Sequence, residues 1–330
     1  MNVRGIVSYR NLSLYLGSSE SSADRINYSP NNRGFIGVGA FVFDLGFEVS
    51  VRTPQRFERD IDDYGETDYI DIQTHIYGKK WNFDLALQRY QGFFISNPGQ
   101  VDPYWQNQDA FPTRRDLRAN HFLANVIYLF NSDDFSFRAA FNQTEKQIRS
   151  AGSTLILTSF TSFRLFGDSV LVHPEAIDPF GPNTSLVDGR FNTLSLMPGY
   201  SYNFTYKNIL INATVSGGLG LQYQNYEMEA VQRRAMQVEP KVNFRAALIY
   251  DTENFFVGTT YVNHQSKIYV ENLRINNSIS NLRLFAGYRF KKFGIFKRFS
   301  INDILKPLER KLFGEIIKGK SFKISINNLK

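Results

Sequence analysis

The most constraining feature of this chain is a two-residue alternation of apolar and polar side chains that recurs along most of its length. In residues 282–290, Leu282 and Phe290 suit an apolar environment, whereas Arg283 and Arg289 do not. Successive side chains of a β-strand point to opposite faces, so a period of two gives each set its own face. Repeated along a whole chain, this pattern is typical of a transmembrane β-barrel, which has lipid outside and a polar interior.

The composition favours strands over helices as the membrane-crossing elements. Phe (30) and Tyr (18) supply most of an aromatic content of 15%, and outer-membrane barrels place such residues at both membrane interfaces. No apolar run reaches the roughly 18 residues that a transmembrane helix requires. Cysteine is absent, which excludes disulfides and thiolate metal sites. No apolar leader segment follows Met1, so we expect either the processed form or a shortened form of an exported protein.

Thirteen stretches are candidate strands, and the connections between them alternate in length. Short connections such as 78–80 contrast with long ones near 17–32, 53–66, 96–117 and 225–237, and outer-membrane barrels have short periplasmic turns and long extracellular loops. The candidate strands are 3–16, 33–43, 45–52, 67–77, 81–95, 118–130, 135–146, 153–165, 190–206, 208–224, 240–251, 254–265 and 278–290.

The strand number meets a conflict of direction, because a single-chain bacterial barrel has an even number of strands. Residues 135–146 should run outward and residues 190–206 inward, and 153–165 alone cannot satisfy both. If 153–165 belongs to an outer hairpin, about twelve strands span the membrane, which we prefer; if 168–174 adds a strand, there are fourteen. Pro198 lacks an amide hydrogen inside 190–206, so we expect a β-bulge there.

Residues 291–330 differ in character from residues 1–290, which form the predicted barrel. This tail carries a net charge of +8 in a chain whose total is +7. Apolar residues recur there at helical spacing, so we predict a short amphipathic helix in a basic periplasmic tail. The tail either covers the barrel mouth or inner leaflet, or docks a partner. Its candidate contact residues are Lys306, Arg310, Lys311, Lys318 and Lys320.

Polar residues on the inner faces of the strands are the candidate functional residues of the barrel. Both charge signs occur among them, and an unpaired charge in a confined site is costly, so we expect these groups to pair with one another. The functional alternative is a charged constriction that selects solutes. The polar lumen set comprises Asp71, Gln73, His75, Asp84, Gln88, Arg138, Arg245, Arg283 and Arg289.

Catalysis is a further possibility, because His75 shares a face with Asp71, and Asp84 lies on the next strand. A histidine beside a carboxylate is half of a hydrolase triad, but no Gly-x-Ser-x-Gly elbow accompanies it. The other histidines are scattered, and no group of His, Asp and Glu has metal-ligand spacing. We therefore expect no enzyme activity, no metal and no cofactor. The tail lacks a nucleic-acid-binding module, so we expect no nucleic-acid partner.

Three pairs of short motifs resemble a known family. Tyr28-Ser29-Pro30-Asn31 precedes Gly37-Val38-Gly39, Asp71-Ile72-Gln73 precedes Tyr90-Gln91-Gly92-Phe93-Phe94, and Gln147 precedes Ser150-Ala151-Gly152-Ser153. Over roughly residues 20–290, these motifs resemble an outer-membrane β-barrel family of Bacteroidetes-type bacteria catalogued as a domain of unknown function. The resemblance implies an outer-membrane barrel without an established activity, and it brings no catalytic residues.

The last candidate strand also carries a possible assembly signal. Gly287, Tyr288 and Phe290 look like the terminal signal that the barrel-assembly machinery reads, and we expect this strand to pair with the first. Three functions stay open: a structural or accessory subunit of a cell-envelope complex whose tail or loops engage partners, a narrow porin-like solute channel, and a membrane-embedded hydrolase. The expected partners are outer-membrane lipid, the assembly machinery and other outer-membrane or periplasmic proteins.

Overall fold

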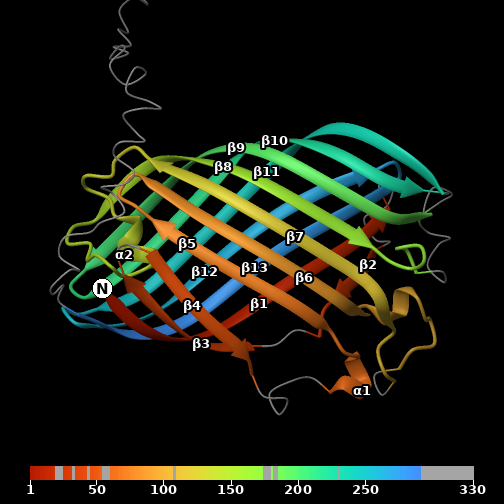
Figure 1. The fold of residues 1–330 in the computed structure, drawn as a ribbon, viewed down its shortest axis with the longest axis horizontal. Helices are drawn as coiled ribbons and strands as arrows, with labels where there is room; N and C mark the ends of the chain where they lie inside the picture. Colours follow the sequence, from red (N-terminus) through yellow and green to blue (C-terminus); the bar gives the residue numbers. More distant parts are fainter. Residues whose placement is uncertain are drawn as a thin grey trace, which may run out of the picture.

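A computed structural model describes residues 1–18, 25–31, 34–42, 45–53, 60–106, 109–173, 180, 185–228 and 230–290. Thirteen strands in these ranges form one antiparallel sheet that curls into a barrel (Figure 1). The strands are β1 Asn2–Ser18, β2 Arg25–Ser29, β3 Gly34–Val42, β4 Leu45–Arg52, β5 Asp68–Tyr77, β6 Trp81–Ile95, β7 Thr113–Leu129, β8 Ala151–Phe166, β9 Leu186–Tyr206, β10 Ile209–Met228, β11 Val231–Asp251, β12 Phe255–Val270 and β13 Leu273–Arg289. The connections include the short helices α1 Ile61–Tyr64 and α2 Phe137–Phe141, and the 3-10 helix η2 Pro98–Gln100.

The barrel closes where its first strand meets its last. β1 pairs with β13 along its whole length, from Asn2 opposite Arg289 to Ser18 opposite Leu273, as expected for the final strand. Ten strands, β1, β2 and β6–β13, make a closed circuit, and β3–β5 lie outside that circuit as a second arc from β1 to β6. The all-β antiparallel barrel is thus confirmed, and the count of about twelve spanning strands stays a prediction.

The strand predicted over 135–146 is wrong. β7 ends at Leu129 and β8 begins at Ala151, and the chain between them folds back into the barrel mouth as α2. Ser136 caps this helix, because its hydroxyl accepts a hydrogen bond of 3.1 Å from the amide of Ala139. With 135–146 removed, residues 153–165 belong to the long strand β8 and the conflict of direction disappears. The predicted outer hairpin at 153–165 is therefore also wrong, and 168–173 contain no strand.

The long connection predicted near 225–237 is wrong as well. β10 continues to Met228 and β11 begins at Val231, and Ala230 takes a positive φ of 60° in the turn between them. β12 and β13 likewise extend beyond their predicted ends and meet in a tight turn after Val270. The polar residues there belong to hairpins that lengthen the barrel wall. Antiparallel strands can face water, so polar side chains do not prevent their pairing.

Pro198 does not produce the predicted bulge. It keeps its pair with Ile156 of β8, and on its other side the β9–β10 ladder omits the pairs at Gly217 and Gly218 without a change of register. Proline has no amide hydrogen to donate there. A Cβ on Gly218 would lie 2.0 Å from the carbonyl oxygen of Leu196. Glycine therefore lets the two strands approach closely where the ladder is interrupted.

The outer wall of the barrel is apolar, and charged side chains are buried inside the barrel. Val38 is 65% exposed and Val49 is 69% exposed on the outside, while the guanidinium-bearing Arg245 is 1% exposed inside. A soluble protein has the reverse distribution, whereas a transmembrane barrel requires this one. The alternation in the sequence therefore reports two different surroundings. No helix in the described ranges is long and apolar enough to cross a membrane.

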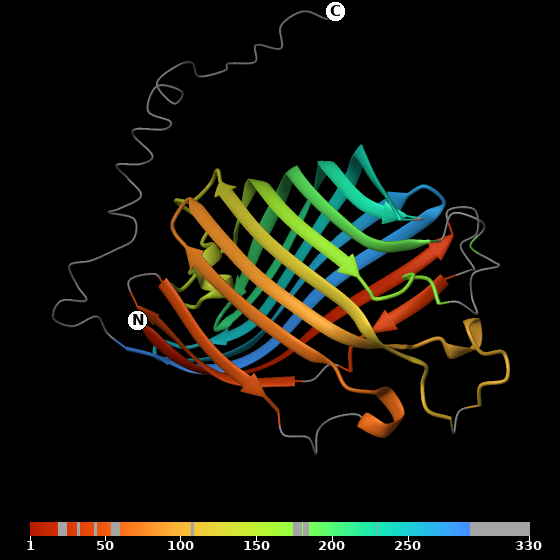
Figure 2. The ribbon, with the colours of Figure 1, turned by 45° about the vertical axis from the view of Figure 1, so that its right-hand side comes forward.

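Two apolar clusters fill the barrel interior, one near each end. The N-terminal-end cluster lies where the chain begins and where α2 enters the barrel (Figure 2), and it contains Leu129, Phe137 and Phe141. The far-end cluster contains Leu14 and Tyr28 together with side chains from the longer connections. Charged and polar residues lie between the two clusters. The candidate functional site is therefore an enclosed polar layer.

Candidate functional site

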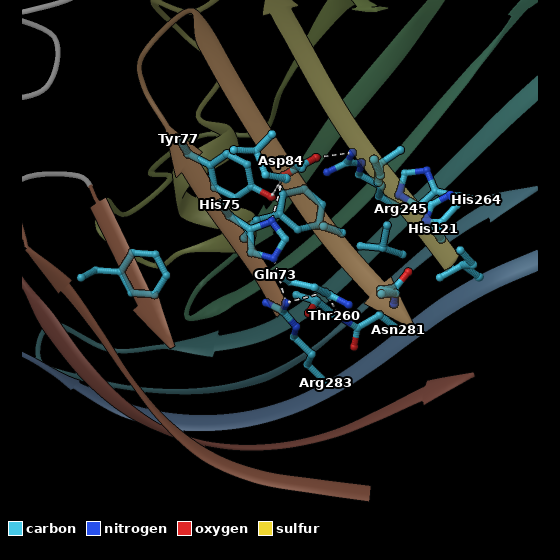
Figure 3. Close-up of a pocket in the computed structure, with 18 of the residues that line it drawn as sticks. Gln73, His75, Tyr77, Asp84, His121, Arg245, Thr260, His264, Asn281 and Arg283 are labelled. Atoms are coloured by element: carbon cyan, nitrogen blue, oxygen red, sulfur yellow. Dashed lines mark hydrogen bonds and ion pairs between the residues drawn. The ribbon is translucent and has the colours of Figure 1, made fainter. Parts of the chain in front are cut away.

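The polar layer centres on the carboxylate of Asp84. Asp84 of β6 lies directly opposite His75 of β5 in the ladder, which places His75 Nδ1 2.9 Å from Asp84 Oδ1. The same oxygen accepts a hydrogen bond of 2.8 Å from the hydroxyl of Tyr77, and Oδ2 accepts one of 2.6 Å from Arg245 Nη2 (Figure 3). Arg245 comes from β11, so this ion pair joins two separate parts of the barrel wall.

A second set of contacts leads from His75 towards the N-terminal-end cluster. Arg283 Nη2 donates to His75 Nε2 at 2.8 Å, and Arg283 Nη1 lies 3.2 Å from Glu48 Oε2. Glu48 also pairs with Arg4, which donates to Gln143 Oε1 at 2.7 Å. Because arginine only donates, Nε2 of His75 is an acceptor and Nδ1 carries the proton. His75 is therefore held as a neutral bridge between Asp84 and Arg283.

Asp71 is the centre of a third set of contacts, on the β1 side of the layer. Arg10 Nη1 lies 3.1 Å from Asp71 Oδ1. The amide of Gln88 donates to Asp71 Oδ2 at 2.9 Å, and the amide of Gln73 donates to Oδ1 at 3.0 Å. Gln73 in turn accepts a hydrogen bond of 2.9 Å from Asn281 on β13. The structure thus brings seven of the nine predicted lumen residues into one layer.

The other two predicted lumen residues, Arg138 and Arg289, lie at the N-terminal end of the barrel. Arg138 on α2 pairs with Glu145. Arg289 Nη1 lies 3.0 Å from Asp251 Oδ1, and Arg289 Nε donates to the Gln143 carbonyl at 3.0 Å. Arg289 therefore holds the connection that contains α2, and Arg138 forms an ion pair within that connection. The sequence pattern had assigned each charge to a face of the barrel but could not show its height along the barrel.

Sequence reasoning missed Arg4, Arg10 and Glu48, which pair with each other or with the predicted residues of the layer. A signal was present, because Arg4 and Arg10 share a face of β1 with Ser8, at the same two-residue period that marks other inward positions. The five predicted contact residues of the tail lie outside the described residues. Tyr288 and Phe290 are exposed on the outer face near the end of β13, and their role as an assembly signal stays a prediction.

The space left inside the polar layer is small. A cavity of about 60 Å³ is lined by His75, Asp84, His121, Arg245 and His264 among others, and it has room for a few water molecules, each of which needs about 10–15 Å³ of such space. Three of the four histidines thus meet at one place, although the sequence scatters them. Within the described ranges, no group of three or more His, Asp or Glu side chains is placed to hold a metal ion.

The sequence motifs that carry the family resemblance form hydrogen bonds between separate segments of the chain. At the far end, Asn31 donates to the Gly65 carbonyl at 2.7 Å, and the Thr67 hydroxyl donates to the Gly92 carbonyl at 2.8 Å. Gly92 has a φ of +87°, and a Cβ there would lie 2.3 Å from the Glu66 carbonyl oxygen, so only glycine fits. The ladder shifts register between Gln91 and Phe93 at this position.

Gln147, another motif residue, holds the segment that contains α2. Its side-chain oxygen accepts a hydrogen bond of 2.8 Å from the Ser136 amide and one of 3.2 Å from Asn203 of β9. Its side-chain nitrogen donates to the carbonyls of Asp134 at 2.7 Å and Arg149 at 2.8 Å. Two of these contacts tie the chain before α2 to the chain after it, the contact with Arg149 lies within the chain after α2, and the fourth ties the segment to β9, so the motif has a structural role.

Comparison with protein families decides the classification. A family model described as a domain of unknown function (DUF4421) matches residues 1–290. The chain belongs to this family. The resemblance predicted from the motifs is thus confirmed for a domain of unknown function, and the Bacteroidetes-type origin stays a prediction. No curated protein matches this DUF4421 chain.

Solved structures that resemble this DUF4421 barrel include several outer-membrane proteins. The outer-membrane protease OmpT from Escherichia coli has a TM-score of 0.36 and 11% identity, over 88% of this chain and 97% of that one. The translocator domain of the autotransporter NalP from Neisseria meningitidis has a TM-score of 0.32 and 10% identity, over 87% and 88%. Ail, the attachment invasion locus protein of Yersinia pestis, has a TM-score of 0.24 and 10% identity, over 88% and 100%. These scores are too low to bear on the activity of this chain.

Proposed function

We propose that this protein is an outer-membrane barrel with a closed lumen that serves as a structural or accessory subunit of a cell-envelope complex. The observation that supports this most strongly is the filled interior: two apolar clusters enclose a layer of paired charges, and the cavities between them measure about 60 and 40 Å³. A channel needs a continuous polar path, and an enzyme needs a cleft that admits its substrate. The surfaces of this barrel that a partner or ligand can reach are therefore its outer wall and its two ends.

The apolar outer wall supports a location in the outer membrane. So many exposed apolar side chains are unfavourable in water. Within lipid, a closed barrel is one of the two structures in which every backbone N–H and C=O group can be hydrogen-bonded. The outward residues of the second arc, such as Val38, Val49 and Ile72, belong to the same apolar wall. We therefore count β3–β5 as spanning, which gives twelve spanning strands with β2 as a short addition. The short turns then face the periplasm.

The hydrolase alternative finds no support in the polar layer. Both ring nitrogens of His75 are engaged, by Asp84 and by Arg283. The described residues that line the small cavity include no serine that could act as a nucleophile. An inward histidine with two partners stabilises the layer instead of activating a reactant. We therefore propose that the protein is not an enzyme.

The partner-binding surface that we propose is a hollow at the periplasmic end. It has a volume of about 880 Å³ and lies between the β5–β6 turn and the two arms that flank α2, residues 131–136 and 145–152. Ile148 at its edge is 84% exposed, and the neighbouring Lys146 and Arg149 are exposed too. The hollow thus offers a partner an apolar contact at Ile148 and a guanidinium at Arg149, and arginine is enriched in protein interfaces. The basic tail, residues 291–330, would add further contacts.

Affinity isolation from native membranes tests this partner assignment. The full chain should retain a stable complex through washing in mild detergent. The variant Ile148→Glu, and a chain that ends at Phe290, should each lose most of it. Glu253→Gln is the control, because Glu253 is exposed in the β11–β12 turn at the same end. A full chain that purifies alone under these conditions would argue against an accessory role.

A closed lumen also predicts that the barrel does not conduct ions. We expect the purified barrel to give no stable current steps in planar lipid bilayers, because its interior has no continuous polar path. An open porin inserted into the same bilayers is the control for the measurement. Regular current steps that change in size with Arg245→Ala would favour the channel alternative and contradict the closed lumen.

A further inference from the structure

A row of polar side chains crosses four neighbouring strands on the outside of the barrel. Arg164 of β8 lies opposite Arg190 of β9, Arg190 lies opposite Asn225 of β10, and Asn225 lies opposite Arg234 of β11. These strands run side by side in Figure 1. Neighbouring strands are about 4.8 Å apart, so this arginine row spans roughly 14 Å.

The arginine row marks the end of the apolar wall on all four strands. Each member lies on the outward face, and the outward residues that precede it on the way from the periplasmic end are hydrophobic or small and polar. The exposed hydrophobic residues nearest to the row are Phe160 on β8, Leu194 on β9, Tyr223 on β10 and Met236 on β11. In an outer membrane, lipid headgroups lie at this boundary between apolar and polar wall.

The row carries more positive charge than its ion pairs in the described ranges neutralise. Arg164 Nε lies 3.0 Å from Asp188 Oδ1, so this guanidinium has a counter-charge. Arg190 and Arg234 are exposed, and neither has an ion-pair partner within the ranges that the structure describes. Arg164 and Arg190 are direct cross-strand neighbours, and like charges in that position repel. A bound anion would remove this repulsion.

We propose that the arginine row binds the phosphate groups of outer-leaflet lipid. A guanidinium offers paired donors that match a phosphate, and such charge-assisted hydrogen bonds strengthen where water is scarce. Asn225 lies between Arg190 and Arg234, and its amide adds a further donor. The proposal rests on the outer-membrane location given above, and it adds a ligand to the outer face of the barrel.

Lipid binding to the detergent-solubilised full chain, counted by native mass spectrometry, tests this site. The probes are a bisphosphorylated lipid A and the same lipid without phosphate. The wild type should bind the phosphorylated form roughly tenfold more tightly or better, as expected for two charge-assisted contacts. The double variant Arg190→Ala and Arg234→Ala should lose this preference, and replacement of both by Lys should keep part of it, because lysine retains the charge without the fork.

Two controls show whether the preference depends on the arginine row itself. Lys207→Asn removes an exposed cation at the opposite end, in the β9–β10 turn, where asparagine tolerates the positive φ of 53°, and it should leave the preference unchanged. Heat-modifiable electrophoretic mobility shows that each variant is folded. Equal binding of the two lipids by the wild type, an unaltered preference in the double Ala variant, or displacement by inorganic phosphate at the lipid's own concentration would each overturn the proposal. A protein that stays monodisperse without detergent would instead overturn the membrane location itself.

Discussion

Replacing Arg245 by methionine is expected to lower the free energy of unfolding by about 3–5 kcal/mol, because it leaves a buried carboxylate without its counter-charge. The side chains of Arg245 and Asp84 are 2% and 6% exposed, and their closest atoms are 2.6 Å apart. Only the neutral groups of Tyr77 and His75 would then contact Asp84. Urea unfolding of the barrel in phospholipid vesicles measures the loss.

A double-mutant cycle separates the ion pair from simple packing. When Asp84→Asn is added to Arg245→Met, most of the lost stability should return, since replacing both charges of a buried pair is often close to neutral. Arg164→Met is the matched control, because the Arg164–Asp188 pair is more exposed, at 36% and 29%, and such pairs contribute at most about 1 kcal/mol. Equal losses at the two arginines would contradict a stabilising polar layer.

Replacing Gln147 by leucine is expected to release the α2 segment from the barrel mouth. The variant loses four hydrogen bonds and leaves the Ser136 amide unpaired, which we expect to cost about 2–4 kcal/mol. The loss is local, so the segment should open more often while the strands stay paired. Cleavage by trypsin at Lys146 and Arg149 should accelerate by about thirtyfold or more, because proteolysis follows the population of the open form and each 1.4 kcal/mol changes that population about tenfold.

The control for this experiment is a residue at the same hollow with a weaker role. Lys79 contacts Asp133 with side chains that are 53% and 84% exposed, so Lys79→Ala should leave the cleavage rate nearly unchanged. If the Gln147→Leu variant resists trypsin as well as the wild type does, the apolar contacts of α2 alone hold the segment, and Gln147 is not its anchor.

The α2 segment also shows where the two-residue pattern misleads. Phe135, Phe137 and Phe141 alternate with polar residues in the sequence as they would in a strand, but all three are buried in the N-terminal-end cluster. Alternation shows which side chains are buried away from water. A short helix folded into a barrel mouth can bury alternate side chains as a strand does. The turn residues 131–134 and the cap at Ser136 were the local signals that favour a break at this point.

The hairpins show the opposite error, in which real strands lacked the pattern. Gln224 faces inward on β10, and Gln232 and Arg234 face outward on β11, so polar residues occur on both faces beyond the apolar wall. The period of two weakens where both surroundings are polar, because hydrophobicity no longer distinguishes the faces. Backbone hydrogen bonding between β10 and β11 continues into this polar part, as an extension of the same antiparallel ladder.

By itself, the sequence determined the class of the fold, the closure of the last strand on the first, and which residues along most strands face inward. Those features depend on differences in hydrophobicity between residues that are close in the sequence, and such differences can be read from the sequence itself. Only the tertiary structure decided which inward charges meet. Arg245 and Asp84 are 161 residues apart in the chain, and their contact depends on the curvature and stagger of the whole barrel. The filled lumen and the arginine row follow from the same geometry, because register between strands aligns residues that no local pattern connects.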